Sequence, residues 1–221
     1  MSRDSFRYLK MANDWYLLKS YSGMLRVNPD FNWIPPGAIG LMVLLSCFGI
    51  PVFYSCIVIN LYALFLTGLV VCKIVSLLTK DIKAGYLCGI LTVLHPTLLG
   101  YGIVVQRESC YLFCCSLFLL GLAYCLKSQY SFGSLICGIG SGCGILVRYE
   151  AYELPFLFFI LFGIIVFLKK EKKMLYINNI FLFFASFVAF FLIYCFLLNC
   201  WDYAFFLAKT AYFTQYIQKI I

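Results

Sequence analysis

Two short charged stretches interrupt an otherwise apolar sequence. Arg107 and Glu108 stand side by side in QRESCY, and Arg148 is followed by Glu150 and Glu153 in VRYEAYELP. A guanidinium group presents a fork of donors that matches phosphate oxygens, and it stays charged near lipid. A carboxylate can accept a proton, orient an arginine or bind a divalent cation. These residue types therefore predict a phosphate site at Arg107 and Arg148, with carboxylates beside it.

The elements that must position these residues are membrane helices. The chain has 221 residues, of which 64% are hydrophobic and 12% charged, and its mean hydropathy is +0.95. Apolar runs of about 18 residues or more recur, which is typical of a polytopic helical membrane protein. The sequence thus predicts an all-α fold and excludes a soluble domain of this length. The first 33 residues are too charged and too aromatic for a signal or transit peptide.

Six apolar stretches are expected to span the membrane, with boundaries uncertain by a few residues. They are Val52–Leu78, Ala84–Val105, Ser109–Leu126, Phe132–Val147, Tyr152–Leu168 and Leu175–Leu198. Ala38–Gly49 is too short to cross a ~30 Å hydrocarbon core at ~1.5 Å per residue, so it predicts a juxtamembrane or re-entrant helix. The chain divides into an outer segment (1–37), this short helix (38–50), a transmembrane bundle (51–198) and an outer amphipathic segment (199–221).

The charges predict which side of the membrane each loop faces. One set of loops carries Lys80, Lys83, Lys127, Lys169, Lys170, Lys172 and Lys173, and lysine-rich loops are cytoplasmic as a rule. The opposite side receives most of the acids, namely Asp4, Asp14, Asp30, Glu108, Glu150, Glu153 and Asp202. The net charge is +8, but the basic residues lie mostly at helix ends and at the N-terminus, where membrane topology and contact with lipid headgroups explain them. No nucleic-acid partner is therefore expected. The candidate site therefore faces away from the cytoplasm.

Cysteines and glycines favour packing roles over chemistry. The chain has 12 cysteines, almost all in apolar runs, with no CxxC pair and a single His95, which predicts inert thiols and no metal site. The stretch GSLICGIGSGCGILV lacks the features of a nucleotide-binding loop. Its spaced glycines instead predict close contact between helices. These are Gly133, Gly138, Gly140, Gly142 and Gly144.

Four segments in this order resemble a known family. They are RDSFRYLKMAND, NWIPPGAIGLMVLLSCFG, LHPTLLGYGIVVQRESCYLF and GILVRYEAYELP. Together, over roughly residues 2–155, they resemble the GT-C-type membrane glycosyltransferases, and most closely the bacterial branch related to protein O-mannosyltransferases and aminoarabinose transferases. The resemblance implies that Asp4 is the acid of the first outer loop, that Pro35-Pro36 begins the juxtamembrane helix, and that Glu108 is the acid of a later loop. It also implies that an N-terminal helix and a C-terminal part are missing here.

The expected activity is sugar transfer on the non-cytoplasmic face. Nucleotide sugars are absent there, so the expected donor is a polyprenyl-phosphate-linked sugar and the acceptor is a lipid, a glycan or a protein. Asp4 and Glu108 are the predicted catalytic acids, with Asp4 as the base for the acceptor hydroxyl. Arg107 and Arg148 are expected to hold the donor phosphate. Supporting roles are expected for Glu150, Glu153 and Arg3. No metal ligand is assigned, and a divalent cation is left open. The expected membrane is the bacterial inner membrane, or the endoplasmic reticulum in a eukaryote.

Two alternatives stay open. A multi-pass transporter or flippase component would place polar groups inside its helices, where Asn60, Lys73 and the pair His95-Pro96 are the candidates. The His-Pro pair is expected to be a helix kink. The second alternative is a non-catalytic remnant of a transferase, because loss of a first helix would leave Asp4 poorly held.

Overall fold

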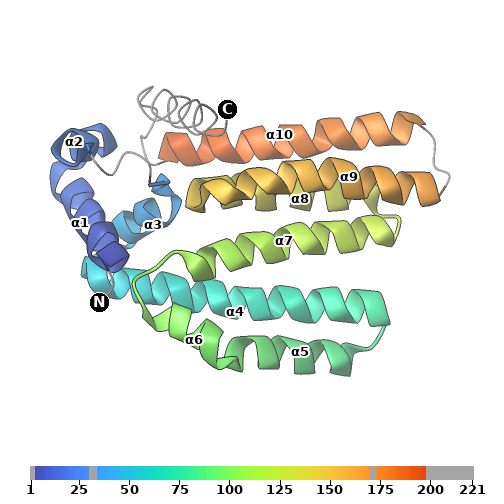
Figure 1. Ribbon diagram of the computed structural model, residues 1–221, viewed down its shortest axis with the longest axis horizontal. Coiled ribbons are helices and arrows are strands. Elements are labelled where there is room, and N and C mark those ends of the chain that lie inside the picture. Colours follow the sequence, from blue (N-terminus) through green and yellow to red (C-terminus); the bar gives the residue numbers. More distant parts are fainter. Residues whose placement is uncertain (1–2, 30–33, 170–172, 198–221) are drawn as a thin grey trace, which may run out of the picture.

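The computed structural model describes residues 3–29, 34–169 and 173–197 (Figure 1). The helices are α1 (Arg3–Leu18), α2 (Tyr21–Val27), α3 (Pro36–Cys47), α4 (Val52–Thr79), α5 (Ile82–Leu94), α6 (Pro96–Ile103), α7 (Glu108–Leu126), α8 (Tyr130–Val147), the short 3-10 helix η2 (Tyr149–Tyr152), α9 (Glu153–Leu168) and α10 (Lys173–Leu197). These residue ranges contain no β-strand. The predicted all-α fold is confirmed.

The long helices from α4 to α10 run side by side, as Figure 1 shows. Four stretches are long and apolar enough to cross a membrane: α4, α7, α8, and η2 together with α9. The pair α5 and α6 makes a fifth if it is one broken span. The chain is therefore built as a membrane protein with four to five helices suited to crossing. The predicted sixth span coincides with α10 and stays a prediction.

The predicted span Ala84–Val105 is divided in two. Helix α5 ends at Leu94, α6 begins at Pro96, and the two axes are bent by 53°. Proline has no backbone N–H and disfavours helical geometry in the residue before it. His95 accordingly has the extended angles φ −62° and ψ 123°. The expected kink at the His-Pro pair is confirmed, and it is sharp enough to end one helix and start another.

Glycines let α7, α8 and α10 approach closely. A Cβ atom added at Gly133 of α8 would lie 2.5 Å from the carbonyl oxygen of Gly121 in α7. A Cβ added at Gly138 would collide with the backbone of Phe183 in α10. Only glycine fits such contacts, so the close packing predicted from the glycine spacing is confirmed. It fixes the position of the C-terminal end of α8, which carries Arg148.

Replacing Gly133 by Ala is expected to destabilise the bundle. The added methyl group would meet backbone atoms that cannot move aside, and such overpacking costs about 1–3 kcal/mol. The midpoint of thermal unfolding in detergent should fall. Gly100→Ala is the matched control, because no atom lies within 4 Å of a Cβ at Gly100 in α6. Equal midpoints for the two variants would contradict close packing at Gly133.

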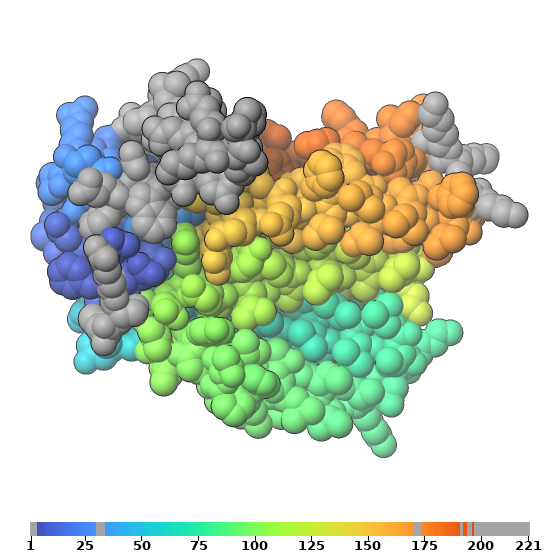
Figure 2. Space-filling model, viewed as in Figure 1, coloured from blue at the N-terminus to red at the C-terminus, as the bar shows by residue number. Residues whose placement is uncertain are grey.

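The N-terminal helices form a cap over one end of the bundle. Figure 2 shows these residues, in blue, gathered at one end of the molecule. The buried face of α1 includes Tyr8, Met11 and Trp15. Helix α3, which the sequence predicts as a juxtamembrane or re-entrant helix, is largely buried and contacts α1, α4 and α8. The predicted outer segment 199–221 lies outside the described residues.

The opposite end of the bundle carries the lysines. It contains the connections α4–α5 and α7–α8 and the end of α9 at Lys169 (Figure 1). Lys169 donates hydrogen bonds to the carbonyl oxygen of Leu126 at 2.5 Å and to Ser128 Oγ at 2.9 Å, and so ties the end of α9 to the α7–α8 connection. The structure thus separates the lysines Lys80, Lys83, Lys127 and Lys169 from the Arg-Glu stretches by the full length of the helices.

Candidate functional site

The two Arg-Glu stretches meet at the capped end of the bundle. Helix α7 begins at Glu108, and α8 returns beside it to end at Val147. Arg107 Nη1 donates to the carbonyl oxygen of Val147 at 3.3 Å. Arg148 Nη1 lies 3.8 Å from Glu108 Oε1. Four of the predicted site residues, Arg107, Glu108, Arg148 and Glu150, therefore form one cluster, which we call the charged cluster.

Arg148 is the paired arginine of this cluster. Its Nη2 donates to Glu150 Oε1 at 2.9 Å and its Nε to Glu150 Oε2 at 3.3 Å, which is a two-pronged contact. Its guanidinium also lies 5.3 Å from the ring centre of Tyr111. The hydrogen bonds to Glu150 raise the pKa of Arg148 above its ordinary value. With Glu108 as a second carboxylate partner, the positive charge of Arg148 is already balanced within the protein.

Arg107 has no such balance. Its guanidinium lies 5.6 Å from the ring centre of Tyr8 and bonds a backbone carbonyl, but no carboxylate of the described residues forms an ion pair with it. Its Nε is buried and has no hydrogen-bond partner within the described ranges. The same holds for Oγ of Ser109, which is 1% exposed. Two uncommitted polar groups therefore lie at the start of α7.

Glu108 holds the backbone as well as the arginine. It is the first residue of α7, where a negative charge is stabilised by the helix dipole. Its Oε2 accepts a hydrogen bond from the backbone N–H of Arg107 at 2.9 Å, while Oε1 faces Arg148. The carboxylate thus fixes the local path of the chain and leaves little freedom to its own side chain.

Helix α1 brings Asp4 towards the charged cluster. Asp4 lies in the first turn of α1 with 57% of its side chain exposed, and its Oδ1 pairs with Arg7 Nη1 at 3.3 Å. Tyr8 follows one turn later on the same face and is buried. Burial raises the pKa of Tyr8, and Arg107, Glu108, Asp4 and Arg148 all lie close enough to act on it. The Tyr8 ring therefore joins α1 to Arg107, with Asp4 one turn earlier on the same helix.

Two supporting residues lie apart from these contacts. Glu153 is exposed at the first position of α9, and no ion pair of its carboxylate occurs among the described residues. The backbone of Arg3 begins α1, but its side chain lies outside the described residues. The structure therefore brings Glu150 into the cluster and leaves Glu153 at its margin.

Tyr8 and Tyr111 are the site residues that the sequence analysis missed. Both rings lie against an arginine of the charged cluster. The four-residue spacing between Asp4 and Tyr8 was the available signal for Tyr8, since it places both side chains on one face of a helix. Tyr111 lies one turn after Arg107 and Glu108, but tyrosines are so common near membrane surfaces that their type alone indicates no role.

No group of three or more His, Cys, Asp or Glu side chains within the described ranges could hold a metal ion. Ten cysteines in these ranges carry free thiols. A divalent cation at the charged cluster would have the carboxylates of Glu108 and Glu150 as its nearest ligands, and both already contact Arg148.

The polar residues proposed for a transporter have structural explanations. Asn60 is buried and bonds backbone carbonyls of the α6–α7 connection. His95 is exposed at the break between α5 and α6, and Lys73 is exposed on the outer face of α4. Asn60 also contacts the thiols of Cys56 at 3.6 Å and Cys110 at 3.7 Å, and none of the three residues forms an ion pair within the described part of the chain.

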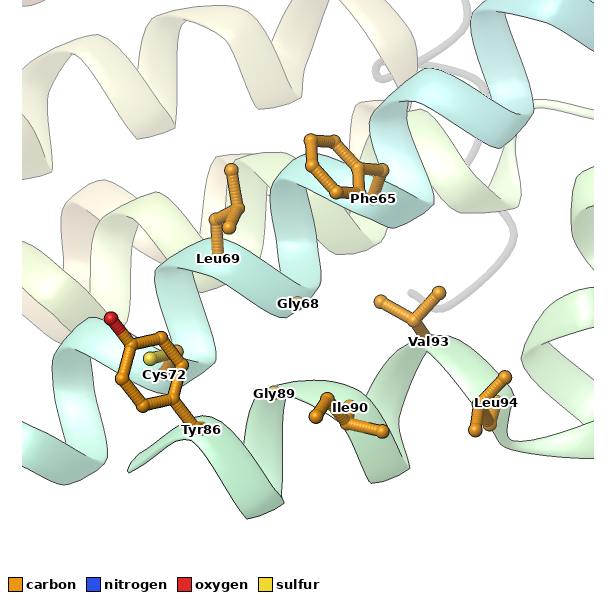
Figure 3. A pocket seen from close by; sticks show the side chains of 9 residues that line it. All are labelled: Phe65, Gly68, Leu69, Cys72, Tyr86, Gly89, Ile90, Val93 and Leu94. Atoms are coloured by element: carbon orange, nitrogen blue, oxygen red, sulfur yellow. The ribbon is translucent and has the colours of Figure 1, made fainter. Parts of the chain in front are cut away.

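An apolar groove of about 290 Å³ lies between α4 and α5 (Figure 3). Its lining residues are Phe65, Gly68, Leu69, Cys72, Tyr86, Gly89, Ile90, Val93 and Leu94. None of them belongs to the charged cluster. The groove is lined by apolar residues, one tyrosine and one cysteine, and no charged side chain lines it. The charged cluster is therefore the better candidate site.

Comparisons with protein-family models, with curated proteins and with solved structures find no match to this chain.

Proposed function

We propose that this chain is a membrane glycosyltransferase of the GT-C type. It moves a sugar from a polyprenyl-phosphate-linked donor to a lipid, glycan or protein acceptor on the non-cytoplasmic face. The observation that carries the proposal is Arg107, a cation without a carboxylate partner among the described residues. It lies where apolar helices end, at the depth expected for lipid phosphates.

The distribution of charge supports an anionic ligand. Arg148 is balanced by Glu108 and Glu150, whereas the guanidinium of Arg107 contacts a tyrosine ring and a neutral carbonyl and has no carboxylate partner in the described part of the chain. A phosphate would supply the missing negative charge and accept hydrogen bonds from Arg107 Nε and Ser109 Oγ. A ligand with a long apolar tail fits this place, because the tail stays in the bilayer while the phosphate reaches the helix ends.

The reaction assigns a separate role to each charged group. The acceptor hydroxyl attacks the anomeric carbon of the sugar, the bond from that carbon to the phosphate oxygen breaks, and the lipid phosphate leaves with the electron pair. Asp4 takes the proton of the acceptor hydroxyl. Arg107, with Arg148 behind it, stabilises the negative charge that develops on the departing phosphate. Glu108 orients Arg148. Supporting roles around the charged cluster are assigned to Glu150, Glu153 and Arg3.

The proposed topology has six spans, with α5 and α6 as one broken span and α10 as the sixth. The lysine end faces the cytoplasm, following the positive-inside rule, and the charged cluster faces the opposite side. The membrane is the bacterial inner membrane, or the endoplasmic reticulum in a eukaryotic cell. A site within the bilayer for a transported solute has less support, because Asn60, His95 and Lys73 each have another explanation.

The topology predicts opposite labelling of the two ends. In a cysteine-free background, Glu153→Cys is expected to react with a membrane-impermeant maleimide added to intact cells, because Glu153 is exposed beside the charged cluster. Lys83→Cys, exposed at the lysine end, is the matched control and should react only after the membrane is opened. The reverse pattern would put the charged cluster in the cytoplasm and remove the reason for a lipid-linked donor.

The direct test is sugar transfer by the purified chain in liposomes. A panel of polyprenyl-phosphate hexoses and pentoses is supplied together with candidate lipid, glycan and peptide acceptors, and the release of polyprenyl phosphate is measured. Release with at least one donor, and none with the corresponding nucleotide sugars, is the expected result. No release from any lipid-linked donor would favour the remnant or the transporter.

A further inference from the structure

We propose that Asn60 is a positioning residue that holds Arg107 and Glu108 in place from inside the membrane domain. This inference rests on the proposed function, because it deepens the role of the same site. Asn60 lies in α4 and is 1% exposed. It does not belong to the charged cluster, and its partners lie 44 and 46 residues further along the chain.

Both donors of the Asn60 amide are used on one short segment. Nδ2 donates to the carbonyl oxygen of Val104 at 2.9 Å and to that of Gln106 at 2.8 Å. These residues form the connection between α6 and α7, where no regular helix satisfies the backbone. A buried carbonyl without a partner is costly, so the amide stabilises this non-helical path.

The contact reaches the charged cluster through a single peptide group. The carbonyl oxygen of Gln106 and the N–H of Arg107 belong to the same planar peptide. Asn60 binds the carbonyl side of that plane, and Glu108 Oε2 accepts from the N–H side at 2.9 Å. Glu108 Oε1 then faces Arg148 at 3.8 Å. Asn60 therefore sets the orientation of the plane that aims Arg107 and anchors Glu108.

The surroundings of Asn60 demand an amide. The Cys110 thiol lies 3.7 Å from Oδ1 and can donate to it, so the oxygen points away from the two carbonyls. A carboxylate at this position would face two carbonyl oxygens with no proton to offer. Asn60 also lies about 12 Å from the start of a helix about 42 Å long, at ~1.5 Å per residue, and therefore nearer the charged cluster than the middle of α4.

The chain contains a matched control. Asn179 of α10 is also buried, at 2% exposure; its Nδ2 donates to the carbonyl oxygen of Leu175 at 2.8 Å, and its Oδ1 accepts from Ser134 Oγ at 3.3 Å. It lies near the lysine end, where α8 and α10 begin. Asn60→Leu and Asn179→Leu remove the same chemical group from equally buried positions, but only the first touches the α6–α7 connection.

The experiment compares the two variants of the full chain in detergent by two measurements. Hydrogen exchange of the backbone amides, followed by mass spectrometry, reports on the connection without reference to activity. Binding of polyprenyl phosphate reports on the proposed site. Asn60→Leu is expected to exchange the amides of Arg107 and Tyr111 roughly tenfold faster and to bind the lipid roughly tenfold more weakly. Asn179→Leu should change neither value.

Three results would overturn the inference. Exchange at Arg107 and Tyr111 that is unchanged in Asn60→Leu would show that the amide holds nothing in place. Equal acceleration in both variants would reduce Asn60 to a general stabiliser. Faster exchange with unchanged lipid binding would separate the connection from the site. If Asn60→Leu does not fold, Asn60→Ser and Asn179→Ser serve as the pair, since serine keeps a hydroxyl but cannot reach both carbonyls.

A failure of the proposed function would give a different result in the binding measurement. The wild-type chain would then bind polyprenyl phosphate no better than polyprenol. The exchange comparison between the Asn60 and Asn179 variants would still decide whether Asn60 holds the Gln106–Arg107 peptide.

Discussion

Asp4→Asn is expected to lower the rate of sugar transfer by at least about 100-fold, the usual contribution of a general base. The amide has nearly the shape of the carboxylate but cannot take the proton of the acceptor hydroxyl. Asp4 lies in the first turn of α1, largely exposed and one turn from the buried Tyr8. Donor binding should change little, because the proposal assigns the donor phosphate to Arg107 and Arg148 and not to Asp4. The measurement is the transfer rate at saturating donor, with donor affinity determined in parallel.

Asp14→Asn is the control on the same helix. Asp14 Oδ2 accepts a hydrogen bond from Asn28 Nδ2 at 2.8 Å, and an asparagine oxygen could accept the same bond. This variant should transfer sugar at the wild-type rate. A normal rate for Asp4→Asn would remove Asp4 from the role of base, and equal losses in both variants would point to a general requirement for an acidic α1.

Arg107→Gln is expected to weaken donor binding by about 10- to 100-fold, since hydrogen bonds to charged groups contribute about 1.5–3 kcal/mol each. Arg107 is the cluster cation that has no carboxylate partner within the described residues, so a donor phosphate loses most when its charge is removed. Arg107→Lys keeps the charge without the fork of donors and should give an intermediate affinity. Equilibrium binding of a polyprenyl-phosphate sugar is the measurement.

Arg26→Gln is the matched control for charge. Arg26 is exposed in the last turn of α2, in the same N-terminal cap, and removing it lowers the net charge by the same amount. If both variants lose affinity equally, the effect comes from overall charge and lipid attraction. If Arg107→Gln binds as the wild type does, Arg107 is only a membrane-surface anchor.

The sequence predicted the helices well because apolar run length and proline position are local signals. The starts of α4 at Val52 and α7 at Glu108 follow from Pro51 and from the charged pair, and α5 ends at Leu94 because Pro96 disfavours helical geometry at His95. The number of spans does not follow from the length of the apolar runs alone. The predicted span Ala84–Val105 is bent by 53° between α5 and α6, and such a bend is not visible in the composition of the stretch.

The contents of the site were only partly predictable. Sequence spacing indicated that Arg107 and Arg148 share one membrane face. It could not indicate that Arg148 has two carboxylate partners while Arg107 has none in the described chain, because that depends on how α7 and α8 are packed. The same is true of Asn60, which looks from the sequence like an isolated polar residue in a helix. Its hydrogen bonds to Val104 and Gln106 form only because the folded chain places α4 beside the α6–α7 connection.

The position of α1 could not be predicted from the sequence. The sequence predicted an outer loop segment over residues 1–37, and the structure adds that residues 3–18 and 21–27 are helical and cap the bundle. The charges of α1 mask its apolar face, on which Tyr8, Met11 and Trp15 are buried. That face packs α1 against the end of the bundle where Tyr8 contacts Arg107.

The most direct test of the central claim is the affinity of the purified chain for a polyprenyl-phosphate sugar, with the corresponding polyprenol as control. Both measurements are repeated with Arg107 and Arg148 changed to Gln. The proposed function predicts that the wild type prefers the phosphate-linked donor by at least about tenfold, the contribution of one charge-assisted hydrogen bond, and that the double variant loses this preference. Equal binding of donor and polyprenol by the wild type would contradict a lipid-phosphate site at the charged cluster.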